Sequence, residues 1–154
     1  MTPIATWFAN YSGDHRNATN QRIHVWCVPA ILWSVIALLW CVPVPETFGR
    51  PGLWSGLAMA AASIFYWQLS RSLEFGMLVG FVAFGVSCEL LRRRYGVPML
   101  LWTAATVFVV AWIGQFVGHK IEGRKPSFLT DLSYLLIGPL WVLAKLYRKL
   151  GIPY

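Results

Sequence analysis

Three histidines are the residues with the most informative chemistry in this sequence of 154 residues. His15 and His24 lie in the polar stretch GDHRNATNQRIHVW, which leads into the first long apolar run. His119 lies in WIGQFVGHKIEGRKP, where a later apolar run ends. Imidazole binds zinc, copper, iron and nickel, so three histidines that meet at one place could hold such a metal.

Polar and small residues accompany His119 at helical spacing. Gln115, His119 and Glu122 are spaced i, i+4 and i+7, which places them on one face of a helix. Gly114 and Gly118 lie beside them, four residues apart, and such a pair of small residues allows a second helix to pack closely. Polar residues near membrane depth are costly, so this group favours a functional site over a simple helix end.

The stretch around the first two histidines has a similar pattern. Asn17, Asn20 and His24 share one helix face, and Tyr11 and His15 are four residues apart. His15 and His24 are out of phase on a straight helix. If both bind one metal, the chain must break between them or His15 must lie in a loop folded over the site. The Gly-Asp pair before His15 is a suitable turn. In the alternative without a metal, Asn20 caps the helix and His24 is an interfacial residue.

The composition predicts the elements that must position these side chains. Hydrophobic residues make up 57% of the chain and charged residues only 12%, whereas a soluble domain carries about 25% charged residues. We therefore expect a single integral-membrane domain over residues 1–154, built as an all-α polytopic helical bundle with about four to five transmembrane helices. The long, non-alternating apolar runs disfavour strands.

The apolar runs predict five helices, preceded by a polar N-terminal segment over 1–24. The predicted helices cover about 25–42, 53–69, 75–91, 97–118 and 132–146. The last run is shorter and contains Gly138-Pro139, so it is interpreted as a kinked span, a re-entrant segment or an interfacial helix. The first residues lack the pattern of a secretory signal, and we expect them to remain in the mature protein.

Helix counting predicts that all three histidines lie at one membrane face. If the first four apolar runs each cross the membrane, the chain returns after 97–118 to the side on which it began. His119 would then lie at the same face as His15 and His24. Lysine and arginine are almost evenly divided between the two sides, so membrane orientation stays open.

Charge and cysteine content exclude other classes of function. The net charge of +7 would suggest nucleic acid for a soluble protein, but basic residues of membrane proteins gather beside anionic headgroups. No nucleic-acid module is recognisable, and no nucleic-acid partner is expected. Cys27, Cys41 and Cys88 lie in apolar runs without a CxxC pair, so they are predicted to be small buried hydrophobes rather than disulfide or zinc residues.

Two blocks of the sequence resemble the iron(II)-dependent 2-hydroxy fatty acid dioxygenases, the fungal-type fatty acid α-oxidation enzymes and their bacterial relatives. The blocks are YSGDHRNATNQRIHVWCVP and WIGQFVGHKIEGRKPSFLTDLSYLLIGPLWVLAKL, and they flank nearly the whole helical core. Cys27 stands where relatives often have glycine. The residues that match the family pattern are Tyr11, His15, Asn17, Asn20, His24 and Pro29 in the first block and Gln115, Gly118, His119, Glu122, Pro126 and Pro139 in the second.

The resemblance implies an Fe(II) cofactor and removal of one carbon from a 2-hydroxy acyl chain. His15, His24 and His119 are the predicted metal ligands, and Glu122 could replace one of them, because the usual facial triad contains a carboxylate. A 2-hydroxy fatty acid and molecular oxygen would be the substrates, within a lipid bilayer. The predicted catalytic-site residues are Tyr11, Asn17, Asn20, Gln115 and Glu122. The predicted residues for the substrate carboxylate are Arg16, Arg22, Lys120 and Arg124.

Three other functional hypotheses remain open at this point. One is a di-iron hydroxylase or desaturase, although such sites use many more histidines. The second is a haem-binding or transport membrane protein, and the third is a non-enzymatic membrane adaptor. A bacterial protein of this kind would lie in the inner membrane and a eukaryotic one in the endoplasmic reticulum. The sequence leaves substrate chain length, stereochemistry and a homo-oligomer open.

Overall fold

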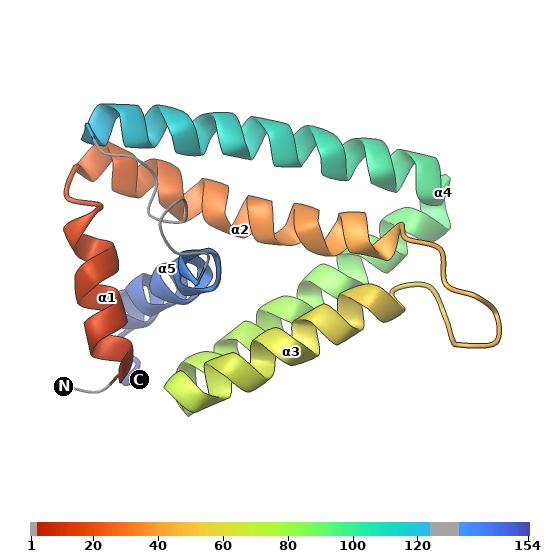
Figure 1. The fold of residues 1–154 in the computed structure, drawn as a ribbon, viewed down its shortest axis with the longest axis horizontal. Coiled ribbons are helices and arrows are strands. Elements are labelled where there is room, and N and C mark those ends of the chain that lie inside the picture. Colours follow the sequence, from red (N-terminus) through yellow and green to blue (C-terminus); the bar gives the residue numbers. More distant parts are fainter. Residues whose placement is uncertain (1–2, 124–132) are drawn as a thin grey trace.

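The computed structural model describes residues 3–123 and 133–154, and this part of the chain is helical with short connections. The described residues contain no strand, so the all-α prediction is confirmed (Figure 1). The helices in chain order are α1 (Pro3–Gly13), α2 (Ala18–Trp40), α3 (Leu53–Leu69), α4 (Arg71–Glu122) and α5 (Tyr134–Leu150).

Helix α4 contains a sharp change of direction at Gly96, which divides it into two arms. Gly96 has φ 83° and ψ 169°, a backbone conformation that glycine adopts without a side-chain penalty. Pro98 follows in the first turn of the second arm, where a missing N–H costs least. The arms correspond to the predicted helices 75–91 and 97–118. The first arm lies beside α3, and the second lies beside α2 (Figure 1).

The predicted number of membrane spans is higher than the structure supports. Only α2 and α4 among the described helices are long and apolar enough to cross a membrane, instead of the four to five helices predicted. Helices α3 and α5 have 17 residues each, and α5 has Arg148 and Lys149 in its last turn. The outer surface of α4 nevertheless exposes large apolar side chains along its length, including Phe75, Val82 and Val110. Such a surface indicates membrane association.

The N-terminal segment predicted as simply polar contains a helix, α1, that ends at Gly13. The chain then turns, and α2 begins at Ala18. The predicted break between His15 and His24 is therefore confirmed. The alternative in which Asn20 caps the helix does not agree with the structure. Asn17 is the N-cap, and its side-chain oxygen accepts hydrogen bonds from the backbone N–H groups of residues 19 and 20.

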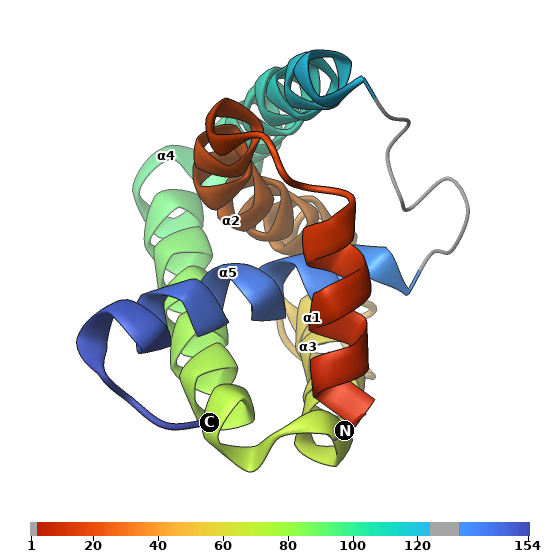
Figure 2. The same ribbon diagram turned by 90° about the vertical axis from the view of Figure 1, so that its left-hand side faces the viewer.

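Helix α5 crosses the other helices rather than extending α4 or pairing along α2 (Figure 2). It begins two residues later and ends four residues later than predicted, and residue 132 lies outside the described residues. Its buried side chains include Ile137, Leu140, Trp141 and Ala144, which recur at helical spacing. The Tyr66 hydroxyl of α3 donates a hydrogen bond of 3.0 Å to the Leu136 carbonyl. These contacts hold α5 against the interior of the bundle.

The three cysteines are free. Cys88 is buried, whereas Cys27 and Cys41 are half-buried. No disulfide therefore constrains the fold, as the sequence predicted.

Candidate metal centre

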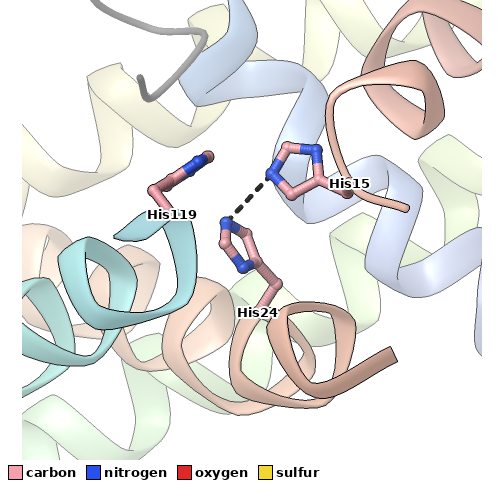
Figure 3. A group of neighbouring side chains, drawn as sticks. All are labelled: His15, His24 and His119. Atoms are coloured by element: carbon pink, nitrogen blue, oxygen red, sulfur yellow. Dashed lines mark hydrogen bonds between the residues drawn. The ribbon is translucent and has the colours of Figure 1, made fainter. Parts of the chain in front are cut away.

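The three histidines meet at one end of the bundle, from three different segments (Figure 3). His15 comes from the connection between α1 and α2, His24 from α2 and His119 from the end of α4. One ring nitrogen from each lies within 4.8 Å of those of the others, and all three side chains are buried. The prediction that helix topology brings these residues together is confirmed.

The hydrogen bonds of His15 and His24 fix which ring nitrogens carry protons. Nδ1 of His15 lies 2.7 Å from the carbonyl oxygen of Tyr11, and Nδ1 of His24 lies 3.0 Å from that of Asn20. A carbonyl only accepts, so each Nδ1 is the donor. In the neutral rings both Nε2 atoms then carry lone pairs, yet they face each other at 3.1 Å. Two facing lone pairs repel each other, and a shared cation would remove this repulsion.

A metal ion fits this requirement better than a proton. Burial lowers the pKa of His15, although its hydrogen bond to the Tyr11 carbonyl acts in the opposite direction, so the imidazolium form is disfavoured. Imidazole nitrogens bind a metal at about 2.0–2.1 Å, and two of them at a right angle around one ion are about 3 Å apart. The observed separation of 3.1 Å matches that arrangement.

His119 completes the group. Its ring centroid lies 5.1 Å from that of His15 and 4.9 Å from that of His24. Its Nδ1 atom is buried and has no hydrogen-bond partner among the described residues. A buried polar atom normally has a hydrogen-bond partner or a bound ion. The unpartnered Nδ1 of His119 therefore indicates that a further group binds at this position.

Glu122 joins the end of α4 to the start of α2, and it is not part of the nitrogen cluster. Its carboxylate accepts hydrogen bonds from the backbone N–H groups of Arg16 and Asn17, with the shortest at 2.8 Å. It also accepts one of 2.9 Å from the side-chain amide of Asn20. Negative charge is favourable at a helix N-terminus. The carboxylate therefore holds the loop that carries His15, and the alternative in which it replaces a histidine ligand receives no support.

The glycine pair of α4 allows this close approach, as predicted. A methyl group at Gly114 would lie 2.6 Å from Sγ of Cys27, and one at Gly118 would overlap the side-chain oxygen of Asn20. Both contacts are with α2. The absence of side chains at these positions therefore brings His119 within reach of His24.

Tyr11 and Gln115 line the same cavity as the three histidines. The Tyr11 ring stacks on His15 with a centroid distance of 4.2 Å, and burial raises the pKa of its phenol. The side chain of Gln115 is buried beside them. The cavity measures about 350 Å³, within the range of ligand sites.

The basic residues predicted for the substrate carboxylate do not line this cavity. Arg16, Arg22 and Lys120 are exposed and are absent from the lining. Arg124 lies outside the described residues, as does Pro126 of the family pattern. The structure therefore brings the three histidines, Tyr11 and Gln115 together, but not the three exposed cations.

Three supporting residues were missed by sequence reasoning. Trp141 packs on Tyr11 and His15, with centroid distances of 5.1 and 5.7 Å. Gln21 donates a hydrogen bond of 2.7 Å to the carbonyl of His15, and Lys145 donates one of 2.7 Å to Gln21. The only sequence signal was that Gln21 lies three residues before His24 on the same face and Trp141 lies four before Lys145.

Comparisons with known proteins identify the family of this chain. The family described as "2-hydroxy-palmitic acid dioxygenase Mpo1-like" matches residues 1–150. A protein of Saccharomyces cerevisiae named 2-hydroxy-palmitic acid dioxygenase MPO1 is 31% identical over 143 residues, which cover 92% of this chain and 78% of that protein. No solved structure matches significantly. The chain thus belongs to the Mpo1-like family of proteins.

Proposed function

We propose that this protein is a non-haem iron(II) dioxygenase that shortens 2-hydroxy fatty acids by one carbon. The observation that carries the proposal is the buried trio of imidazoles, whose nitrogens lie within 4.8 Å of one another at the polar end of an apolar cavity. The name of the yeast relative supplies the substrate class. Three nitrogen ligands suit iron and leave positions open for reactants.

The reaction balances without an external reductant. One 2-hydroxy acid and one O2 give the acid that is one carbon shorter, together with CO2 and water. The bond between C1 and C2 breaks, and C2 becomes the new carboxyl carbon. Iron(II), when bound, supplies the sites at which the hydroxy acid chelates and O2 is reduced.

The residues of the chain orient and shield this centre. The carbonyls of Tyr11 and Asn20 hold the two Nδ1–H groups, which leaves Nε2 of His15 and His24 free for the metal. The ring of Tyr11 and the indole of Trp141 cover His15 and keep bulk water away. Gln115 is buried and lines the cavity, where its amide can orient a bound reactant.

The apolar substrate also accounts for the apolar surface of the protein. Helix α2 and both arms of α4 expose large hydrophobic side chains, and we propose that the protein crosses the membrane several times. A fatty acid partitions into the same bilayer. The enzyme and its substrate would then share one phase.

Haem binding is the second candidate, and the geometry disfavours it. A haem with two axial histidines needs its ligands on opposite sides of the porphyrin. Here the Nε2 atoms of His15 and His24 are 3.1 Å apart, and His119 lies beside both rather than opposite either one. This clustered arrangement favours a single ion.

The proposal is tested on the full chain, purified in detergent and reloaded anaerobically with iron(II). We expect about one iron per chain, no Soret absorption, and oxygen uptake with 2-hydroxypalmitate that matches formation of the acid one carbon shorter. Palmitate, which lacks the hydroxyl group, is the control substrate. It should support neither oxygen uptake nor formation of a shorter acid.

Three outcomes would overturn the proposal. Iron-loaded protein that consumes no oxygen and leaves 2-hydroxypalmitate intact would exclude the dioxygenase activity. A Soret band at stoichiometric haem would favour the second candidate. Protein that binds no metal under these conditions would favour the adaptor.

A further inference from the structure

The cavity at the metal centre is closed around its polar groups and exposed along part of its apolar lining. The histidines, Tyr11 and Gln115 at the polar end are between 1% and 6% exposed. In contrast, Val35 of α2 is 38% exposed and Leu135 of α5 is 44% exposed, and both line the cavity. Other apolar residues of the lining include Val28, Ile31, Leu32, Phe108, Trp112 and Leu136.

The cavity extends along two helices to the same depth. On α2, Val35 follows His24 by eleven residues, and on α4, Phe108 precedes His119 by eleven residues. Close approaches of Gly114 to Cys27 show that these segments pack side by side. At 1.5 Å of rise per residue, both walls extend about 16 Å from the histidines.

The exposed part of the lining is continuous with an apolar outer surface. Val109, Val110 and Ile113 on the second arm of α4 are all more than half exposed. Val35 lies inside α2, one of the two helices apolar enough to cross a membrane. A cavity that is closed around its polar groups and open among such side chains faces lipid rather than water.

We propose that the acyl chain enters this cavity sideways from the bilayer, through its exposed apolar lining at Val35 and Leu135. The carboxyl end moves inward to the histidines, and the tail remains directed at the lipid. The identity of the head group rests on the proposed dioxygenase function, whereas the route of the alkyl chain rests on the cavity alone.

The depth of the cavity sets the length of chain that it holds. Carbon–carbon bonds of about 1.5 Å at tetrahedral angles advance an extended chain by about 1.25 Å per carbon, so about 13 carbons span the walls. A 16-carbon acid therefore reaches the opening. Longer tails extend into the bilayer, and the KM for substrates in vesicles should fall with chain length only up to about this size.

Blocking the opening provides a kinetic test. In the full chain reconstituted in phosphatidylcholine vesicles, Val35→Trp and Leu135→Trp should raise the KM for 2-hydroxypalmitate by about fivefold or more, because added bulk in a filled channel is costly. Iron content should not change. The matched control is Val109→Trp, which places the same side chain beside Phe108 but outside the cavity lining. Equal KM values in all three variants would overturn the proposal.

Photolabelling tests the route without turnover. A 2-hydroxypalmitate analogue with a diazirine near its methyl end should label peptides that contain Val35, Phe108 or Leu135, and excess 2-hydroxypalmitate should compete. Labelling confined to other peptides, or labelling without competition, would exclude the route. Competed labelling at the opening in a protein without oxygen uptake would leave the route intact and reject the dioxygenase function instead.

Discussion

The Nε2 atoms of His15 and His24 lie 3.1 Å apart, although nine residues separate them and a straight helix would place them on different faces. The approach depends on the end of α1 at Gly13 and on the start of α2 at Ala18. With both Nδ1–H groups donating to carbonyls, the two Nε2 lone pairs are directed at one point.

Replacing any one of the three histidines by alanine should abolish iron binding and turnover. Each ring supplies one of only three clustered nitrogens, and two are too few for tight binding. Iron per chain, measured after gel filtration, checks this result, with circular dichroism as the test of folding. The control is Trp26→Ala, which lies two residues after His24 and is 79% exposed. Retention of full iron by a histidine variant would remove that residue from the ligand set.

Glu122→Gln should weaken iron binding without abolishing it. The amide keeps one acceptor for the N–H groups of Arg16 and Asn17 but loses the charge and directs its own N–H at these donors. Supporting residues of this kind typically contribute 10- to 100-fold in affinity, so saturating iron should restore about one ion per chain. An iron titration measures this. Loss as complete as in His119→Ala would mean that Glu122 is a direct ligand.

Gly118→Ala should lower the stability of the bundle. The added methyl group overlaps the side-chain oxygen of Asn20, and overpacking typically costs about 1–3 kcal/mol. Thermal unfolding in detergent, followed by circular dichroism, measures the change. Gly80→Ala in the first arm of α4 is the control. A methyl group added at Gly80 has no neighbouring atom within 4 Å. This substitution should leave the melting temperature unchanged or raise it, because alanine favours a helix. Equal melting temperatures for the two variants would contradict the tight contact.

Gln21→Ala should weaken iron binding through the loop that carries His15. It removes the hydrogen bond to the His15 carbonyl and leaves Lys145 without that acceptor. We expect a loss of about tenfold in iron affinity. Arg22→Ala is the matched control, since the adjacent arginine is exposed and does not line the cavity, and its iron affinity should be that of the wild type. A similar loss in both variants would point to a general effect on the start of α2.

The sequence alone was sufficient to predict an all-α protein and the convergence of its histidines. Long apolar runs without alternation exclude strands, and counting those runs returns the chain to its starting side. The pattern around Gly114 and Gly118 also predicted close packing, because residues four apart share a helix face. Helix content and the spacing of residues on one helix face depend on residues that are close together along the chain. The periodicity of the sequence is therefore sufficient to predict them.

Other features depend on contacts between segments that are distant in sequence, and only the tertiary structure decided them. The carboxylate of Glu122 accepts hydrogen bonds from residues at the start of α2, 102 to 106 residues away. Apart from their four-residue spacing, Trp141 and Lys145 gave no signal as site residues, because their role arises where α5 crosses the bundle. Spacing along one helix specifies a face, whereas packing specifies which other segment that face meets.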